Sequence, residues 1–141
     1  MKILVATDGS KHALSAVKYA AKLVANMRSN DKITLISVHD DTGLRHAAQF
    51  VGKAEVESYL RELSEKELKS ARKVLVDNGV KYDQAIVIGH VSEEIVKFAN
   101  TGKFDMIIMG SKGRSGIADL LIGSVAQRVL ATAKQPVLLV K

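Results

Sequence analysis

Five short apolar runs alternate with four amphipathic stretches, and this alternation restricts the fold of the chain more than any other feature. The runs are continuous and rich in β-branched and aliphatic residues, as expected for strands buried on both faces of a parallel sheet. Strand and helix alternate to the end, which implies right-handed crossovers. We therefore predict one α/β domain over residues 1–141. The predicted strands are Ile3–Ala6, Ile33–Val38, Ala85–Ile88, Met106–Met109 and Val137–Val140.

The four intervening stretches have the spacing of helices with one apolar face. Ser10 stands where the first helix needs an N-cap, and Asn78-Gly79 supplies a stop for the second. Ser92 is placed to cap the third, and the fourth begins near Ser124. The side chains predicted to face the core are Ala13, Leu14, Val17, Ala20, Ala21, Val24, Leu60, Leu63, Leu68, Ala71, Leu75, Ile95, Ala99, Val125, Val129, Leu130 and Ala133.

Composition narrows the function classes. The chain has no cysteine, which excludes disulfides, thiol catalysis and cysteine-based zinc sites. The net charge of +6 is spread along the chain among acidic residues, with few aromatics, so it favours a solvated surface over a nucleic-acid binder. The apolar run in MKILVATDGS is too short for a signal peptide, and no stretch could span a bilayer. We therefore expect a cytoplasmic protein that binds neither nucleic acid nor membrane.

Polar turns follow the predicted strands, and ligands of open parallel sheets bind at such strand ends, where the strand order reverses. The richest turns are residues 7–10 (TDGS) and 110–113 (GSKG). His39 and His90 also follow strands, but neither has a partner spaced like a metal ligand, so loop histidines are the favoured interpretation. Asp40–Gly52 is weakly patterned and is predicted to be a mobile loop or a short helical excursion.

The segment from Gly110 to Ser124 carries the strongest functional signal. Its glycines allow positive φ angles and let a ligand approach the backbone closely. The helix that opens after Gly123 offers free amide groups and a dipole that favour an anion. Lys112 and Arg114 add positive charge. This combination describes a phosphate cradle, although a surface loop whose glycines only serve turns remains the alternative. The four glycines are Gly110, Gly113, Gly116 and Gly123.

The spacing of Gly110 and Gly113, followed by nine residues and then Gly123-Ser124, resembles the pattern of ATP-binding universal stress proteins. The resemblance also covers MKILVATDGS at the start and QPVLLVK at the end, and so runs across essentially the whole chain. It implies an open five-stranded parallel sheet of order 3-2-1-4-5 with helices on both faces, similar to adenine nucleotide alpha hydrolases.

The resemblance also implies residue roles. The adenine is expected near Ala6, Thr7 and the backbone of Val38. Asp8 is expected near the ribose and phosphates, where it helps to hold Mg²⁺ or Mn²⁺. From the residues alone, Asp8 is either such a ligand or a cap of the first helix, and both roles can coexist. Ala126 stands where nucleotide binders often carry a hydroxyl, so one phosphate contact is missing. The loop residues expected around ribose and triphosphate are Met109, Gly110, Lys112, Gly113, Gly123, Ser124 and Val125.

The chemistry expected of such a site is binding more than turnover. The chain has no G-x-x-x-x-G-K-[ST] loop, no G-x-G-x-x-G motif and no nucleophile triad that could be assembled from residues that should meet. We therefore predict an ATP-binding regulatory or stress-response module with little or no hydrolysis. The alternatives are a slow nucleotide phosphohydrolase, a cyclic AMP-binding module, and an interaction protein with an empty site.

The last predicted strand suggests a homodimer. In the order 3-2-1-4-5, Val137–Val140 is an edge, and an uncovered apolar edge invites pairing with a second copy around a two-fold axis. The resemblance points the same way. The alternative is a monomer whose edge is blunted by its shortness and by the flanking Pro136 and Lys141.

Overall fold

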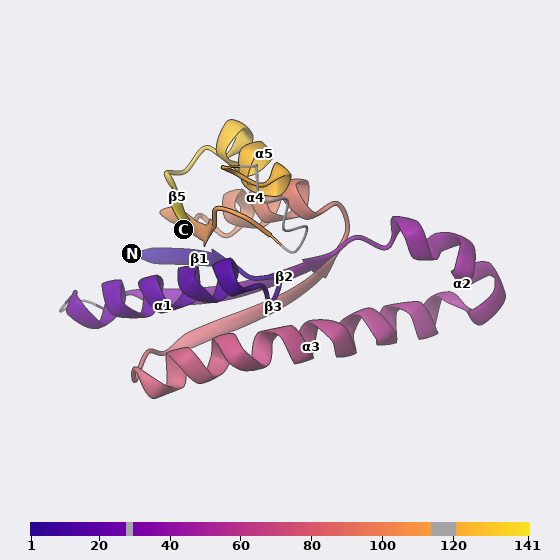
Figure 1. Ribbon diagram of the computed structural model, residues 1–141, viewed down its shortest axis with the longest axis horizontal. Helices are drawn as coiled ribbons and strands as arrows, with labels where there is room; N and C mark the ends of the chain where they lie inside the picture. Colours follow the sequence, from indigo (N-terminus) through magenta and orange to yellow (C-terminus); the bar gives the residue numbers. More distant parts are fainter. Residues whose placement is uncertain (28–29, 114–120) are drawn as a thin grey trace.

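The computed structural model describes residues 1–27, 30–113 and 121–141 (Figure 1). Within these residues, five parallel strands form one sheet in the order β3-β2-β1-β4-β5, so the predicted fold class and strand order are confirmed. β3 begins at Tyr82 rather than Ala85, because Tyr82 and the exposed Asp83 and Gln84 also pair with the start of β2. The strands are β1 (Lys2–Ala6), β2 (Lys32–His39), β3 (Tyr82–Ile88), β4 (Met106–Gly110) and β5 (Val137–Val140).

Helices cover both faces of the sheet. In Figure 1, α3 lies below the strands, and α4 and α5 lie above them; α1 shares the core layer of α3. Alternate residues of β1 serve the two layers: Ile3 and Val5 belong to the core with α1 and α3, while Leu4 and Ala6 belong to the core with α4 and α5. The helices are α1 (Lys11–Asn26), η1 (Thr42–Leu44), α2 (Arg45–Val51), α3 (Lys53–Asp77), α4 (Val91–Thr101) and α5 (Ser124–Thr132).

The helix termini agree with the sequence except in α4. Ser10 caps α1, with its hydroxyl accepting a hydrogen bond from the amide of Ala13 at 3.2 Å. Asn78 and Gly79 end α3, and Gly79 has the positive φ of 66° that favours glycine there. The prediction that Ser92 caps α4 is wrong. The chain is already helical at Val91, and Ser92 is buried inside the first turn.

The predicted core is largely confirmed, with one clear error in α5. Leu130 is 49% exposed, because the inward stripe of this nine-residue helix is formed by Ala126 and Val129. Leu14 and Leu63 are only half-buried. No helix in the described part of the chain is long and apolar enough to cross a membrane.

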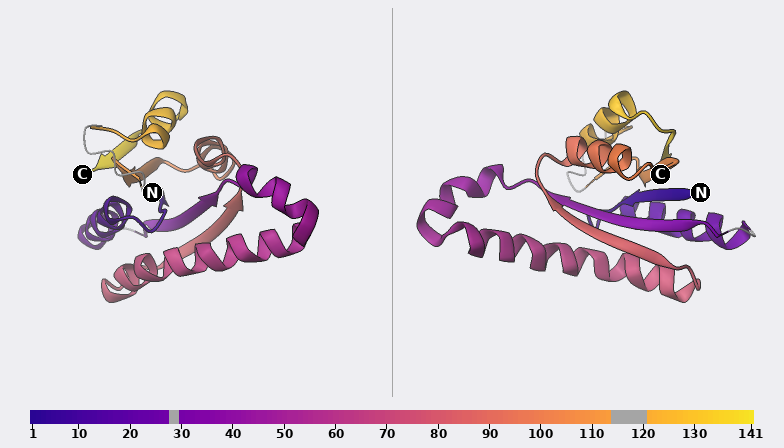
Figure 2. Two further views of the ribbon diagram at one scale, coloured as in Figure 1. Left: turned by 45° about the vertical axis from the view of Figure 1, so that its right-hand side comes forward. Right: turned by 180° about the vertical axis from the view of Figure 1, so that it is seen from behind.

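The weakly patterned residues 40–52 form η1 and α2, which confirms the helical excursion. With the first part of α3 they make an arm that projects beyond the sheet (Figure 1 and Figure 2). At its tip, the side chain of Phe50 is 91% exposed. The arm returns to the body along α3, whose Leu68, Ala71 and Leu75 are buried against the sheet.

Candidate functional site

A cavity opens at the carboxyl ends of β1, β2 and β4, where the strand order reverses on either side of β1. It holds about 690 Å³ of space including its open mouth. The residues predicted to contact the nucleotide line this one cavity: Ala6, Thr7, Asp8, Val38, Met109, Gly110, Lys112, Gly113, Gly123, Ser124 and Val125.

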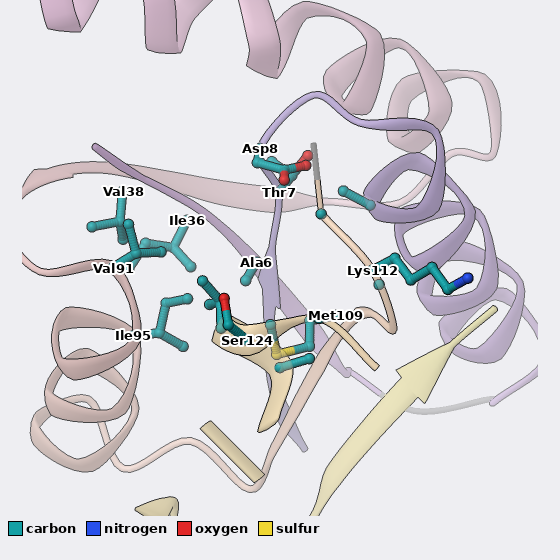
Figure 3. Close-up of a pocket in the computed structure, with 16 residues that line it drawn as sticks. Ala6, Thr7, Asp8, Ile36, Val38, Val91, Ile95, Met109, Lys112 and Ser124 are labelled. Carbon is teal, nitrogen blue, oxygen red and sulfur yellow. The ribbon is translucent and has the colours of Figure 1, made fainter. Parts of the chain in front are cut away.

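One half of the cavity is an apolar slot. Figure 3 shows Ile36 and Val38 of β2 gathered with Val91 and Ile95 of α4. Sequence reasoning missed Ile36, Val91, Ile95 and Ala13 as lining residues, whereas Ala126 lies at the site as expected. Their only signal is helical or strand periodicity, and that signal is the same for a buried core side chain and for a cavity wall.

The backbone of Val38 faces this slot. The carbonyl of Ile36 accepts a hydrogen bond from the amide of Thr7, on the side of β1. The carbonyl of His39 accepts one from Gly89, on the side of β3. Because backbone groups alternate in direction along a strand, the N–H and C=O of Val38 point to the same side as those of Ile36. β1 ends at Ala6, so these two groups point past its end into the cavity.

At the three glycines of the loop that the structure describes, close approach and not positive φ is the constraint, which corrects the expectation of positive φ there. Gly110, Gly113 and Gly123 all lie outside the left-handed region. A Cβ on Gly113 would lie 3.1 Å from Oδ2 of Asp8, so a side chain at this position would press on that carboxylate. A Cβ on Gly110 would instead strike the backbone of His12 at 2.7 Å. Gly110 therefore serves the packing of β4 against α1.

The start of α5 presents backbone donors at the cavity. Gly123 is its N-cap, in an extended conformation, and supplies no side-chain cap. The amide of Gly123 donates to the carbonyl of Ser111 at 2.7 Å, which closes the loop. The first hydrogen bond within the helix is donated by Gln127, so the amides of Ser124 and the two residues after it precede that ladder. Such an end favours an anion.

Asp8 lies at the end of β1, opposite the glycine loop. Its Oδ1 accepts a hydrogen bond from the amide of Ser10 at 2.9 Å, which forms a tight turn. Its Oδ2 would lie 3.1 Å from a Cβ added to Gly113. Asp8 therefore shapes the turn before α1 with one oxygen and faces the glycine loop with the other. Among the described residues, no group of three or more His, Cys, Asp or Glu could hold a metal ion.

The two predicted cations of the loop have different outcomes. Lys112 lines the cavity, but in Figure 3 its side chain extends away from Asp8 and from the apolar group. Arg114 lies outside the described residues, and so does Gly116.

The remaining polar residues of the strand ends are held by local or tertiary partners. His39 is paired with Glu67 of α3, with 2.9 Å between Nε2 and Oε2. The hydroxyl and amide of Thr42 donate hydrogen bonds to Asp40 and hold the pKa of that carboxyl below its usual value. Neither His39 nor His90 lines the cavity. The prediction of a loop histidine is wrong for His39, which is the last residue of β2, while His90 lies between β3 and α4.

The fold is that of a doubly wound α/β protein, and its cavity lies at the topological switch point of the sheet. The model of the universal stress protein family matches residues 1–141, and the chain belongs to that family. It is 35% identical over 141 residues to universal stress protein MJ0531 of Methanocaldococcus jannaschii, covering 99% of this chain and 81% of that one. It is 32% identical over 154 residues to MJ0577 of the same organism, with 99% and 94% covered.

Solved structures agree with this assignment. The structure of MJ0577 superposes with a TM-score of 0.87 at 34% identity, covering 99% of this chain and 94% of that one. A universal stress protein in complex with cAMP superposes with a TM-score of 0.73 at 27% identity, covering 100% and 97%.

Proposed function

We propose that this chain is an ATP-binding regulatory or stress-response module of the cytoplasm, with little or no ATP turnover. The observation that carries the proposal is the cavity itself. It joins an apolar slot, edged by the backbone of Val38, to the uncapped start of α5. An adenine ring fits the first part, and a chain of phosphates fits the second.

The backbone of Val38 favours adenine over guanine. An amide and a carbonyl on the same side of a strand offer one donor and one acceptor to a base edge. Adenine presents the complementary pair, an N1 acceptor beside an N6 donor, whereas guanine carries the O6 acceptor and an N1 donor there. The surrounding side chains are aliphatic and supply van der Waals contact to either ring. The preference for adenine therefore depends on the main chain.

The phosphates would lie between Gly113 and Gly123, at the start of α5. Oδ2 of Asp8 faces this space, and Mg²⁺ or Mn²⁺ suits it, since magnesium in nucleotide sites takes one or two carboxylates and completes its shell with phosphate oxygens and water. Asp8 would hold the ion, and the ion would supply positive charge to the triphosphate.

The proposal includes slow turnover. Among the described residues that line the cavity, Asp8 is the one carboxylate and there is no histidine. A carboxylate that holds a metal is a poor general base for the attacking water. Purified protein incubated with ATP is expected to hydrolyse it far below the ~1–10³ s⁻¹ of dedicated enzymes. Turnover of several ATP per second without a partner would favour the phosphohydrolase alternative.

Cyclic AMP is the second candidate ligand, because the relative of known structure that shares 27% identity was solved with cAMP. Cyclic AMP carries one negative charge and needs no metal, whereas ATP uses both Asp8 and the start of α5. Calorimetry with ATP, ADP, cAMP and GTP, each with and without Mg²⁺, separates the candidates. Tighter binding of cAMP than of magnesium ATP would exclude the ATP assignment.

Gly113→Val tests where the phosphates lie. The Cβ of a valine would lie 3.1 Å from Oδ2 of Asp8, and its methyl groups would occupy the space between the carboxylate and the loop. We expect ATP affinity to fall at least roughly tenfold in a folded protein, since the backbone of Gly113 needs no left-handed conformation. Gly43→Val is the matched control, because a Cβ there meets nothing within 4 Å. Equal ATP affinity in both variants would contradict the site.

The proposal also includes a homodimer through β5. The carbonyl of Pro136 accepts a hydrogen bond from the amide of Ile107, and that of Val140 accepts one from the amide of Ser111. Because backbone groups alternate in direction along a strand, those of Leu138 also point inward, toward β4. Those of Val137 and Leu139 point outward, at the open edge of the sheet. Leu139→Pro removes an outward donor and leaves the β4–β5 ladder intact. Light scattering should give twice the chain mass for the wild type and the mass of a single chain for Leu139→Pro. A wild type that stays monomeric at high concentration would exclude the interface.

A further inference from the structure

The turn that carries Asp8 rests against the side of α3. Gly9, the next residue, has a φ of 78°, which favours glycine. A Cβ on Gly9 would lie 2.9 Å from Cγ of Glu67, 3.1 Å from its Cβ and 3.4 Å from its Cα. The stem of Glu67 therefore fills the space beside the turn, and the turn cannot move toward α3.

Glu67 is itself held in place from the sheet. Its Oε2 lies 2.9 Å from Nε2 of His39, and the two side chains are only 10% and 12% exposed. His39 is the last residue of β2, and its carbonyl accepts a hydrogen bond from Gly89 beyond the end of β3. The pair therefore connects α3 to the end of the sheet at the base of the arm, across 28 residues of sequence.

The turn in contact with Glu67 also sets the direction of the Asp8 carboxylate. Three local hydrogen bonds hold the turn: Gly9 to Oγ1 of Thr7, Ser10 to Oδ1 of Asp8, and Ala13 to Oγ of Ser10. With Oδ1 engaged in this way, Oδ2 faces Gly113. A shift of the turn toward α3 would withdraw Oδ2 from the glycine loop.

We propose that Glu67, held by His39, is a positioning residue that keeps the Asp8 carboxylate directed at the metal and phosphates of a bound nucleotide. The inference rests on the proposed function, because it assumes a metal-bound nucleotide opposite Asp8. Glu67 touches the turn and not the nucleotide cavity, so its effect is carried by geometry.

Simple electrostatics makes the opposite prediction, which sharpens the test. Glu67 adds negative charge near a site for an anionic ligand, so Coulomb repulsion alone predicts that its removal tightens ATP binding. Positioning predicts weaker binding, and only for the metal complex. Glu67→Gln keeps the whole stem against Gly9 and can still hydrogen-bond to His39, whereas Glu67→Ala loses the hydrogen bond and the Cγ, the stem atom nearest to Gly9.

The experiment is calorimetry of ATP with Mg²⁺ and of ATP with EDTA. In Glu67→Ala, the ratio of the two affinities should fall roughly tenfold, as when the support of a metal ligand is lost. Glu67→Gln should restore the wild-type ratio, and Glu62→Ala, an exposed glutamate on the same helix, should leave it unchanged. His39→Ala should lower the ratio as Glu67→Ala does, and the double variant should be no worse than either.

Several results would overturn the inference. Equal loss of both affinities in Glu67→Ala means a structural role only, and tighter binding means repulsion only. If the wild type binds ATP equally well with and without Mg²⁺, there is no metal complex for Asp8 to hold. That result overturns the inference about Glu67 but leaves the proposal of ATP binding intact. A wild type that does not bind ATP overturns the proposed function instead. If Glu67→Ala does not fold by circular dichroism, His39→Ala and Glu67→Gln decide the outcome.

Discussion

Gly110→Ala should destabilise the protein although it adds one methyl group at an unstrained backbone position. The new Cβ would lie 2.7 Å from the carbonyl carbon of His12, 2.8 Å from the amide nitrogen of Ala13 and 2.9 Å from the carbonyl oxygen of His12. All three are backbone atoms in the first turn of α1. They cannot rotate aside as a side chain could, so β4 and α1 must separate.

The size of the effect follows from these distances. Ordinary contact begins at 3.4 Å, so the first turn of α1 must retreat by about 0.7 Å. Overpacking of this kind costs ~1–3 kcal/mol, and the upper end applies because a helix backbone has to move. Alanine restricts the unfolded chain and returns ~0.4–1 kcal/mol. The free energy of unfolding should therefore fall by about 2 kcal/mol.

Urea denaturation followed by circular dichroism, without nucleotide, measures this loss free of any ligand contribution. With a slope of about 2 kcal/mol per molar urea, the midpoint should fall by about 1 M. Gly123→Ala is the control. Its backbone is ordinary, with φ −69° and ψ 159°, and its Cβ would approach other atoms no closer than 3.4 Å. Gly123→Ala should keep the stability of the wild type and lose ATP affinity, because its methyl group enters the phosphate space.

The two variants thus separate a glycine needed for packing from a glycine needed for ligand. An unchanged urea midpoint in Gly110→Ala would show that α1 and β4 are not in the close contact described above. A lowered midpoint in Gly123→Ala, with ATP affinity retained, would reverse the assignment of the two glycines.

Three further predictions follow from the same geometry. In Asp8→Asn, the asparagine can still accept the hydrogen bond from Ser10, so the free energy of unfolding should stay within ~0.5 kcal/mol of the wild type. Calorimetry should show that Mg²⁺ no longer strengthens ATP binding in this variant. Leu130→Lys should leave the urea midpoint unchanged, because Leu130 is already 49% exposed; a large loss would mean that its side chain is covered. The hydrogen bonds from Thr42 lower the pKa of Asp40 in the folded protein. Their contribution to stability is complete above the unfolded pKa of 3.8, where Asp40 is ionised in both states. That contribution is lost as the pH falls through the lowered pKa of the folded protein. The protection factors of the amides in residues 40–52, which compare each exchange rate with its intrinsic rate at the same pH, should therefore fall in acid in the wild type and not in Asp40→Asn.

The fold was predictable because both faces of the sheet are covered. Each strand must then be apolar at consecutive positions, as Ile3 and Leu4 illustrate by serving opposite layers. Such runs stand out in a chain with 26% charged residues. A helix end was predictable where one side chain makes a local hydrogen bond, as Ser10 does at the start of α1. The start of α4 was not predictable from Ser92, because it depends on how the chain leaves β3.

The site was predictable where its chemistry is local in sequence. The turn at Asp8 and the glycines before α5 carry residue types that strands and helices avoid. The slot beside Val38 was found only in part, because Val91 and Ile95 look like any inward face of α4. The contact between Glu67 and the Asp8 turn left no local signal, since it brings together segments far apart in the chain. Only the packed structure shows it.

The edge strand β5 shows how one apolar pattern can have two causes. Leu138 and Leu139 suggested from the sequence that the edge is covered by a second copy. In the structure, Leu138 packs against the core of α1 and α3, and Leu139 packs against the core of α4 and α5. Their apolar character is therefore explained within one chain, by the same rule that makes Ile3 and Leu4 apolar. The case for a dimer then rests on the outward backbone groups of Val137 and Leu139. A second copy paired at this edge gains main-chain hydrogen bonds more than buried apolar area. Dissociation of the dimer should therefore depend on the backbone donor that Leu139→Pro removes. Leu139→Val keeps this donor and should leave the dimer intact.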